Sequence, residues 1–356
     1  MIEEAHEKLT GKVTWPQWIG GIGVALLVCQ TGFMGGWSSP YIAKLTSPGS
    51  SLPITMTEAS WVASLLNFGR PFGAIGGALS ASYLGSKTTI LINSVPIALC
   101  WLFTIVANSV EWLYVSRVLG GISLGMAYSC FSLYLGEIAD PSIRGALVAL
   151  GVIGMPFGNF VMALMGAYLS MVSSGIICLA PCLMLMVIFV WLPESPHHLV
   201  KKKLDEKAKA SIRWYHRNCD VESEFVALKK FVENANEQSF VNTLKEFRDA
   251  RFRKSLSIII MLFMYSQLSG INSIVFYMET ILISTKVAVI EPAQIVIIVM
   301  AFGIVGSALS MFLMDRFGRK ILMIASSAGV TISLCMLTLD FQLLSFGFDP
   351  TTMEGL

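Results

Sequence analysis

Apolar residues in this chain are gathered into long blocks, and this grouping limits the possible folds more than any other feature. Nine blocks reach about 20 residues, the length that an α-helix needs to cross a bilayer at about 1.5 Å per residue. Hydrophobic residues make up 54% of the 356 residues and charged residues only 13%, far below the share in soluble domains. The pattern predicts an all-α membrane protein with about nine transmembrane helices. The expected spans are residues 18–38, 60–82, 88–107, 113–135, 146–169, 173–192, 256–283, 292–314 and 321–343.

The basic residues predict how these spans are oriented. Lys87, Arg144 and the charged block after the sixth span fall on loops of one side, whereas the opposite loops hold little beyond Lys44 and Lys286. Because cytoplasmic loops carry the excess of Lys and Arg, we expect the N-terminus inside the cell. The expected regions are a cytoplasmic N-terminus (1–17), a six-helix half (18–192), cytoplasmic amphipathic helices (193–253), a half with three spans (254–343) and an extracellular tail (344–356).

The segment between the sixth and seventh spans is the one sizeable soluble part of the sequence. Residues 194–253 hold 13 basic and 10 acidic residues, so the charge is mixed rather than polybasic. Apolar residues recur there at helical spacing, which predicts short amphipathic helices beneath the membrane domain. The three series are Leu204, Ala208, Ile212 and Tyr215; Phe225, Leu228 and Val232; and Phe240, Leu244 and Phe247.

The composition disfavours several classes of function. The net charge is only +2 and the basic residues are not gathered on one surface, so we expect no nucleic-acid partner. The seven cysteines lie mostly in apolar segments and have no metal-binding or redox spacing. No paired carboxylates, activated nucleophile or phosphate loop occur where a substrate could reach them. The sequence therefore predicts neither an enzyme nor a cofactor.

A cluster of uncharged polar residues interrupts the seventh span. It runs Ser266-Gln267-Leu268-Ser269-Gly270-Ile271-Asn272. Polar groups in hydrocarbon are costly unless they face a cavity or a partner, so we interpret the cluster as the lining of a solute path. On a continuous helix, one face would carry Ser266, Ser269, Asn272, Ser273 and Tyr277, flanked by Gln267 and Gly270.

The chemistry of this cluster suits a solute rich in hydroxyl groups. The side-chain amides of Gln267 and Asn272 each offer a donor and an acceptor, and a pair of sugar hydroxyls needs both. Gly270 allows the helix to bend or open. The alternative is that these side chains join helices by hydrogen bonds. Gln30 and Asn159, in the first and fifth spans, are further candidates, and helix packing is an equal alternative for Asn159.

An internal repeat links the two parts of the chain. Residues 77–87 after the second span match residues 310–320 after the eighth, with Gly85 equivalent to Gly318 and Lys87 to Lys320. Many transporters are built from such repeats of several spans. The repeat predicts six spans in the second part, of which this sequence supplies three.

Six motifs, in this order, make the chain similar to the sugar porters of the major facilitator superfamily, and among them to the insect facilitated trehalose transporters. The motifs are Gly36-Trp37-Ser38-Ser39-Pro40, Glu58-Ala59-Ser60-Trp61-Val62, Glu137-Ile138-Ala139-Asp140-Pro141-Ser142-Ile143-Arg144-Gly145, Pro193-Glu194-Ser195-Pro196, Gln267-Leu268-Ser269-Gly270-Ile271-Asn272 and Asp315-Arg316-Phe317-Gly318-Arg319-Lys320. The resemblance implies a helical bundle of the major facilitator type in the plasma membrane. It also implies uniport of a sugar, trehalose or a hexose, by alternating access.

The resemblance assigns roles to particular residues. Gln267 and Asn272 match sugar-contacting positions, whereas Ser266 and Val152 stand where many relatives have glutamine. The first span has no interior Asp or Glu, which proton-coupled relatives carry there, and this absence favours downhill transport. The expected solute contacts are Ser266, Gln267, Asn272, Ser273, Tyr277, Gln30 and Asn159.

Charged residues at the cytoplasmic span ends match a family gate, an ion-pair latch between the two halves that breaks for inward opening. Topology signalling is the alternative explanation of these charges. Ser82 and Ser86 stand where the family has Asp and Arg, so the first copy of the gate motif is altered. The expected gate residues are Glu137, Arg144, Glu194, Asp315, Arg316 and Arg319.

Two alternatives stay open at the level of the sequence. With three of the repeat's spans lacking, we expect either an incomplete product that does not carry solute alone or a cavity completed by partner chains. A non-transporting sugar sensor or a regulatory partner of a full-length porter is the rival function. Arg70 of the second span either snorkels to the interface or meets a partner or cavity, and it leaves transport of an organic ion as a further possibility.

Overall fold

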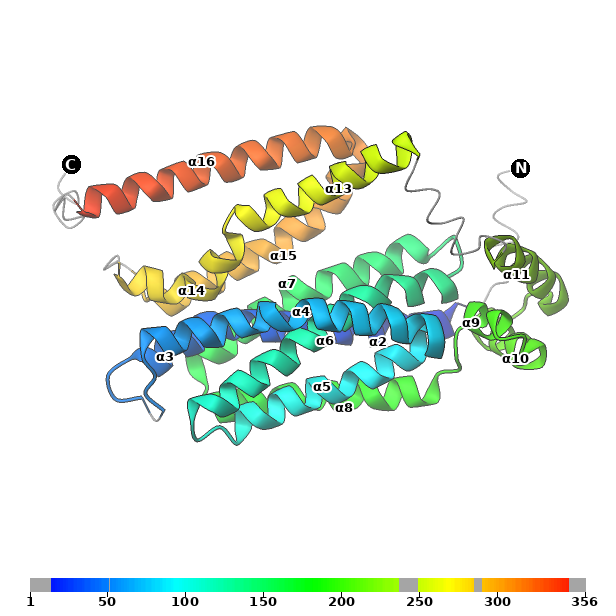
Figure 1. Ribbon diagram of the computed structural model, residues 1–356, viewed down its shortest axis with the longest axis horizontal. Coiled ribbons are helices and arrows are strands. Elements are labelled where there is room, and N and C mark those ends of the chain that lie inside the picture. The colour runs from blue at the N-terminus through cyan, green and yellow to red at the C-terminus, as the bar shows by residue number, and fades with distance from the viewer. Residues whose placement is uncertain (1–13, 51, 237–248, 285–289, 346–356) are drawn as a thin grey trace.

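The computed structural model describes residues 14–50, 52–236, 249–284 and 290–345, which fold as helices joined by short turns (Figure 1). Each of the nine expected spans corresponds to helical structure. The helices of the first half are α2 (Trp15–Gly36), α3 (Ser38–Thr46), α4 (Met56–Leu84), α5 (Ser86–Ile105), α6 (Val110–Ile138), α7 (Arg144–Tyr168) and α8 (Met171–Trp191). They are followed by α9 (Pro196–Lys201), α10 (Asp205–Tyr215), α11 (Val221–Asn236), α13 (Ala250–Leu268), α14 (Ile271–Ser284), α15 (Pro292–Phe317) and α16 (Arg319–Ser345).

Several of the sequence-based expectations concern residues that the structure does not describe. Residues 1–13 of the expected N-terminal region, the series Phe240, Leu244 and Phe247, the loop residue Lys286 and residues 346–356 of the expected tail lie outside the described residues.

Eight segments of the described chain are long and apolar enough to cross a membrane. The pairs α2–α3 and α13–α14 each count as one such segment. Helix α4 is 29 residues long but is not among the eight, because Glu58, Arg70 and many Gly and Ser residues make it more polar. It corresponds to the expected span 60–82, so the number nine stays a prediction.

Local sequence explains where helices begin and end. Helix α4 begins with a capping box, in which Thr55 and Glu58 exchange hydrogen bonds between side chain and backbone. Gly85 follows α4 with φ +99° and Gly318 follows α15 with φ +78°, a conformation that residues with a Cβ rarely adopt. The two glycines thus hold equivalent positions, as the internal repeat predicts.

The first half of the chain forms a closely packed bundle. Helix α4 packs along α6, α2 along α7, and α5 against both α6 and α8. The contact of α4 with α6 requires glycine, because a Cβ on Gly73 would overlap the carbonyl oxygen of Ile122 and a Cβ on Gly125 that of Arg70. The core between these helices is filled by large apolar side chains, among them Trp37, Trp101, Tyr134, Phe189, Leu27 and Met34.

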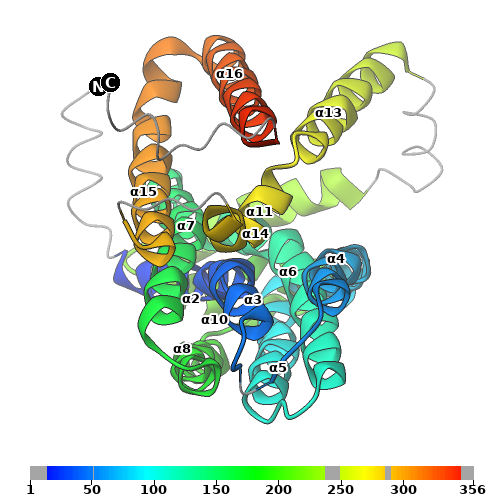
Figure 2. The same ribbon diagram turned by 90° about the vertical axis from the view of Figure 1, so that its left-hand side faces the viewer.

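The second half touches the first mainly at one end of the molecule. Helix α14 packs on α3 and α15 packs on α7, at the end opposite to α9–α11 (Figure 1). Ala163, Val296 and Met300 form the buried centre of this contact. Helices α13 and α16 stand away from the first half (Figure 2), and α13 buries none of its residues. The halves are therefore joined at the α3–α14 end and apart at the other.

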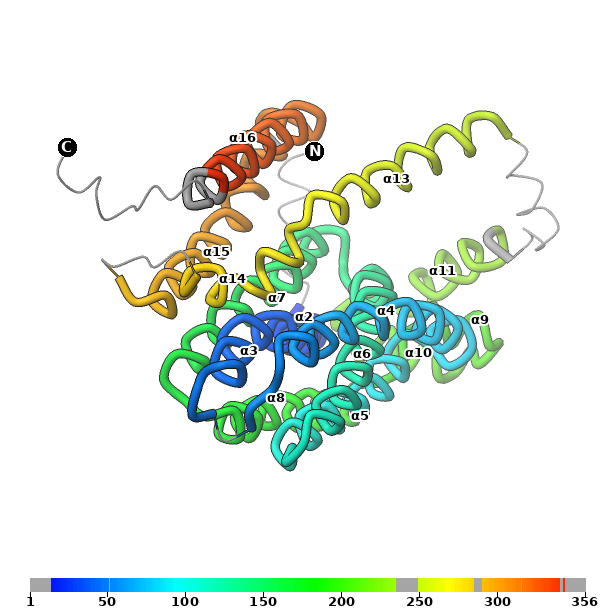
Figure 3. Tube along the Cα trace, turned by 60° about the vertical axis from the view of Figure 1, so that its left-hand side comes forward, coloured from blue at the N-terminus to red at the C-terminus, as the bar shows by residue number. Residues whose placement is uncertain are grey.

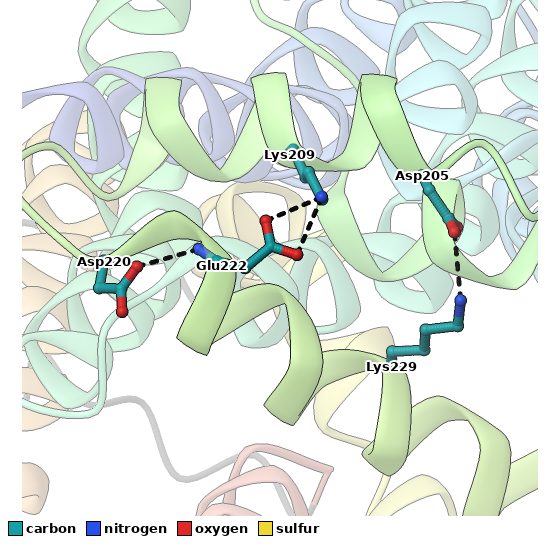
Figure 4. A network of polar contacts seen from close by, with 5 residues as sticks. All are labelled: Asp205, Lys209, Asp220, Glu222 and Lys229. Carbon is teal, nitrogen blue, oxygen red and sulfur yellow. Dashed lines mark hydrogen bonds and ion pairs between the residues drawn. The ribbon is translucent and has the colours of Figure 1, made fainter.

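Helices α9, α10 and α11 form a small layer with its own core, which we call the α9–α11 layer. Its buried residues are Leu199, Val200, Ala208, Ile212 and Phe225. Ion pairs Lys209–Glu222 (2.8 Å) and Lys229–Asp205 (3.1 Å) join its helices (Figure 4). Amphipathic helices are thus confirmed over the first two predicted series, although Leu204 is 43% exposed, because it precedes α10 rather than facing the layer's core.

The α9–α11 layer is fastened to the first half. The side-chain amide of Gln17 donates to the carbonyl oxygen of Tyr215 (3.1 Å) and accepts from the backbone N–H of Asp140 (2.8 Å). The hydroxyl groups of Tyr134 and Tyr215 lie 2.9 Å apart. Because Tyr134 belongs to α6 and Gln17 to α2, the layer is held by both helices.

Candidate solute-binding site and gate

The seventh span is broken near its middle. Helix α13 ends at Leu268 and α14 begins at Ile271, and the chain changes direction between them (Figure 3). Gly270 at the break has φ +72°, while no neighbouring atom lies within 4 Å of the place a Cβ would take. The glycine is therefore required by its backbone conformation rather than by lack of space. The predicted opening of the helix at Gly270 is confirmed.

The break brings the two predicted sugar-contacting amides together. The side-chain N–H of Asn272 donates to the side-chain oxygen of Gln267 at 2.8 Å. On a continuous helix, residues five apart point about 140° away from each other and could not meet in this way. The expectation of one polar face on one helix is therefore wrong, because the polar residues are divided between α13 and α14.

The hydroxyl groups around the break have different surroundings. Ser269 donates to the carbonyl oxygen of Ser266 at 2.7 Å, so that hydroxyl serves the local backbone. Ser266 and Ser273 are exposed, whereas Tyr277 is half-buried and packs against the core of the first half. Tyr277 is thus placed as a contact between the halves.

Gln30 is not part of this site. It is fully buried in α2, where its amide donates to the carbonyl oxygen of Cys178 (2.8 Å) and accepts from the indole N–H of Trp101 (2.8 Å). Both ends of the amide are occupied inside the first half, away from α14. The expectation that Gln30 contacts solute therefore finds no support in the geometry: the sequence shows that a residue is polar but not which neighbours its helix face meets.

Asn159 lies on α7 beside Gly35 and Gly36 of α2. Its side-chain oxygen is buried and accepts no hydrogen bond from any described residue. A buried acceptor without a donor is costly, so this atom is available to a water molecule or a solute hydroxyl.

A cavity of about 650 Å³ lies between α13 and α16, next to the break. Its lining is mainly apolar and includes Tyr265 and Leu268 from α13, Ser269 directly after it, and Leu334 and Thr338 from α16. Gln267 and Asn272 do not line this cavity, although Gln267 is exposed and Asn272 is partly exposed. The amide pair is not sealed inside a dry contact between helices.

The carboxylates expected at the gate form hydrogen bonds within the first half. Glu137 accepts from the hydroxyl group of Ser86, the residue that replaces the family's arginine. Glu194 accepts from the backbone N–H groups of Lys87 and Thr88, each at 3.2 Å, at the start of α5. A carboxylate there caps the helix and interacts favourably with its dipole.

None of the expected ion pairs between the halves is formed among the side chains that the structure describes. Arg144 donates to the carbonyl oxygen of Ala139 at 3.2 Å, and Arg316 lies 5.9 Å from the ring of its neighbour Phe317. Arg319 is exposed in the first turn of α16, and the side chain of Asp315 lies outside the described residues. No ion pair connects the halves within the described part of the chain, because the ends of the two halves that carry the expected gate residues are apart.

Two histidines line a cavity of about 500 Å³ next to these carboxylates, together with Glu137 and Lys201. Burial lowers the pKa of His197, and the nearby positive charge of Arg144 lowers it further, although a hydrogen bond involving Glu137 opposes this. The pKa of His198 is also lowered by burial. Both imidazoles thus favour the neutral form in the folded protein.

Arg117 is a structural residue that the sequence reasoning missed. Its guanidinium group donates to the carbonyl oxygen of Met34 (2.9 Å) and lies 3.8 Å from the ring of Trp37, and the residue is only 3% exposed. It therefore holds the junction of α2 and α3. An arginine inside the apolar segment 113–135 was the signal that could have identified it.

Comparisons with known sequences point to one family. A model of the family described as "Sugar (and other) transporter" matches residues 21–347. The chain is 31% identical over 350 residues to the facilitated trehalose transporter Tret1 of Drosophila mojavensis, covering 96% of this chain and 40% of that protein. It is 31% identical over 324 residues to sugar transporter ERD6-like 6 of Arabidopsis thaliana, covering 91% of this chain and 65% of that protein. The chain thus spans less than two thirds of the length of these relatives.

Solved structures share the fold. The xylose transporter XylE from E. coli, in a partially occluded inward open conformation, matches with a TM-score of 0.65 at 19% identity, over 86% of this chain and 75% of that chain. XylE bound to 6-bromo-6-deoxy-D-glucose, a major facilitator superfamily proton:xylose symporter, matches with a TM-score of 0.66 at 19% identity, over 86% and 70%. The predicted fold, an all-α membrane protein of the major facilitator type, is confirmed.

Proposed function

Because this chain belongs to the sugar transporter family, we propose that it carries a sugar across a membrane by alternating access, downhill and without a coupled ion. Members of this family are transporters of small sugars in the lipid bilayer rather than enzymes. The observation that carries the proposal is the Gln267–Asn272 amide pair, accessible at a break in the seventh span. Trehalose is a candidate solute because the Tret1 relatives are named for it, and a hexose is the other.

The depth of the amide pair supports this role. Gln267 lies 17 residues from either end of the segment Ala250–Ser284, near the middle of the span. Polar groups at mid-membrane depth are tolerated where they face water or a partner. We assign Gln267, Asn272, Ser266 and Ser273 to the solute path from the second half, and Asn159 from the first.

Downhill transport is supported by the absence of a coupling carboxylate. Helix α2 contains no Asp or Glu. Arg117, the buried cation next to its end, is satisfied by a carbonyl oxygen and an aromatic ring instead of a carboxylate. A carboxylate that loads and releases a proton is the simplest coupling device within a membrane, and this part of the chain offers none.

The arrangement of the halves supports alternating access. They meet at the α3–α14 end and are apart near the α9–α11 layer, as in a carrier open toward that layer. We propose that the layer and the N-terminus are cytoplasmic, in the plasma membrane, and that this form faces inward. In the outward-facing form, the ends of the two halves that carry the gate residues would approach each other. Ion pairs would then connect the first-half and second-half gate residues. The first-half set is Glu137, Arg144 and Glu194, and the second-half set is Asp315, Arg316 and Arg319.

Uptake of labelled sugar into liposomes that contain the purified chain tests this function. We expect uptake of trehalose or glucose down its gradient, unchanged when a protonophore collapses the pH gradient. Gln267→Ala and Asn272→Ala should each lower uptake about tenfold, since each removes a hydrogen bond from the solute. Gln294→Ala, which removes an exposed amide at the start of α15, is the control and should have no effect. Uptake that the two site variants leave unchanged would contradict the proposal.

One observation favours a second candidate. Helices α13 and α16 leave most of their side chains uncovered. A sugar sensor, or a regulatory partner of a full-length porter, would bind sugar without carrying it. If the chain alone binds sugar without taking it up, and sugar uptake appears when a full-length porter is added, this candidate is favoured.

A further inference from the structure

Arg70 is a cation midway along α4 that has no hydrogen-bond or ion-pair partner among the described residues. It lies 14 residues from each end of α4 (Met56–Leu84), about 21 Å from either. Its Nε atom is buried without a partner, and no described residue accepts a hydrogen bond from its guanidinium group. A charge at this depth is costly unless it meets an acceptor or a water-filled cavity. Arg70 therefore still needs a hydrogen-bond acceptor.

The surroundings of Arg70 supply hydrogen-bond donors but no negative charge. The titratable group that interacts with it is Tyr128 of α6, whose hydroxyl donates to the sulfur of Met155 on α7 at 3.1 Å. Tyr128 is 46% exposed. By contrast, Arg117 is 3% exposed and has two partners, whereas Arg70 is partly exposed and has no hydrogen-bond partner among the described residues.

Arg70 and Tyr128 lie on the side of the first half that the second half covers. Tyr128 connects α6 to α7 across α2, while α14 packs on α2 and α15 packs on α7. Helix α13 lies above the α4 and α6 side of the bundle (Figures 2 and 3). Gln267 is midway along its span, just as Arg70 is midway along α4. The arginine and the amide pair thus each lie near the middle of a long helical segment.

We infer that Arg70 and Tyr128 form an anion-binding position in the solute path, and that the preferred sugar carries one carboxylate group. The inference rests on the proposed sugar transport and narrows its substrate class. A guanidinium group donates two parallel hydrogen bonds to a carboxylate, and the phenol of Tyr128 can donate a third in place of its bond to the sulfur of Met155. The Gln267–Asn272 pair would hold the neutral hydroxyl groups of the same molecule. Neutral sugars would still bind, but more weakly.

Charge balance separates a carboxylate from a phosphate ester. A carboxylate carries one negative charge, which one arginine balances. A phosphate monoester carries nearly two, so about one charge would remain uncompensated among the described residues. The site should therefore discriminate between a sugar acid and a sugar phosphate of similar size.

Equilibrium binding to the full chain in nanodiscs tests the inference, with glucose, glucuronate and glucose 6-phosphate as probes. We expect glucuronate to bind about tenfold or more tightly than either other probe. Arg70→Gln should remove the preference for glucuronate over glucose, while Arg70→Lys should keep part of that preference. Tyr128→Phe should weaken glucuronate binding severalfold and provides a second test that keeps the arginine. Arg213→Gln removes an exposed charge on α10 and is the control.

Each outcome decides the matter. Equal binding of glucose and glucuronate, or a preference that survives Arg70→Gln, would overturn the inference and leave sugar transport standing. Tighter binding of glucose 6-phosphate than of glucuronate would overturn the assignment to a carboxylate. Glucuronate binding without glucose binding would uphold the inference and contradict a neutral sugar as solute. Binding of none of the probes would contradict both proposals.

Discussion

Asn272 and Gln267 are joined by a 2.8 Å hydrogen bond between their side-chain amides, across the two residues that separate α13 from α14. The bond uses one N–H of Asn272 and the oxygen of Gln267. It leaves the amino group of Gln267 and the oxygen of Asn272 without a partner among the described residues. A donor and an acceptor are thus presented side by side, which is the arrangement that recognises adjacent hydroxyl groups.

Gly270→Ala should disturb this arrangement without affecting the packing. Alanine with positive φ costs roughly 1 kcal/mol, so the chain would relax toward a continuous helix and turn Asn272 away from Gln267. We expect sugar uptake to fall about fivefold, with little change in thermal stability. Gly303→Ala in α15 is the matched control, since it also has no atom within 4 Å but lies within a helix. Equal effects of the two substitutions on uptake would show that the break at Gly270 has no special role.

Two glycines of α4 allow a matched test of the α4–α6 contact. A Cβ on Gly73 would overlap the carbonyl oxygen of Ile122, whereas a Cβ on Gly76 meets nothing within 4 Å. Gly73→Ala should therefore lower the free energy of unfolding by about 1–3 kcal/mol, and Gly76→Ala should leave it unchanged or raise it slightly. Thermal or denaturant unfolding in detergent measures both. A loss of stability for Gly76→Ala as large as that for Gly73→Ala would contradict this account.

The fold could be predicted from the sequence because long apolar segments and loop charges determine it directly. All nine expected spans correspond to helices, and Gly85 and Gly318 end α4 and α15 alike. The start of α3 at Ser38 and the packing of Arg117 against Trp37 just before it could not be foreseen. Tertiary contacts of this kind leave no periodic signal in the sequence.

Gln30 provides a test that separates stability from solute binding. Gln30→Leu would leave the indole N–H of Trp101 without its acceptor in the core, at a cost of about 1–3 kcal/mol. We expect a lower unfolding midpoint and an unchanged affinity for sugar in the folded fraction. If equilibrium binding shows instead that Gln30→Leu lowers the affinity for sugar as much as Asn272→Ala does, Gln30 contacts the solute after all.

Acidification should weaken the attachment of the α9–α11 layer. The pKa of His197 is lowered in the folded protein, so the unfolded state binds more protons between that lowered pKa and about 6.5. Stability therefore rises with pH across this window and is lost as the pH falls through it. Hydrogen exchange of α9 and α10 at pH 5.5 and 7.5 should show more opening at the lower pH. His197→Gln should reduce the difference, and His198, whose pKa is also lowered, should supply the remainder.

The candidate site was only partly predictable. Gln267 and Asn272 could be singled out because uncharged polar residues next to a glycine are conspicuous in an apolar span. Their hydrogen bond could not be foreseen, because it depends on the positive φ of Gly270. In this conformation the halves are apart at the gate, and Glu137 and Glu194 instead bind Ser86 and the start of α5.

The most direct test of the central claim measures whether Asn272 faces water and solute. Asn272→Cys would be made with Cys219 and Cys335, the two cysteines not fully buried, replaced by serine. In nanodiscs, a charged thiol reagent should modify the new cysteine rapidly, and saturating sugar should slow the reaction about tenfold. Phe302→Cys, at a position 70% exposed on the apolar surface of α15, should react slowly with or without sugar. An Asn272→Cys variant as unreactive as Phe302→Cys, or one that sugar does not protect, would contradict the proposed solute path.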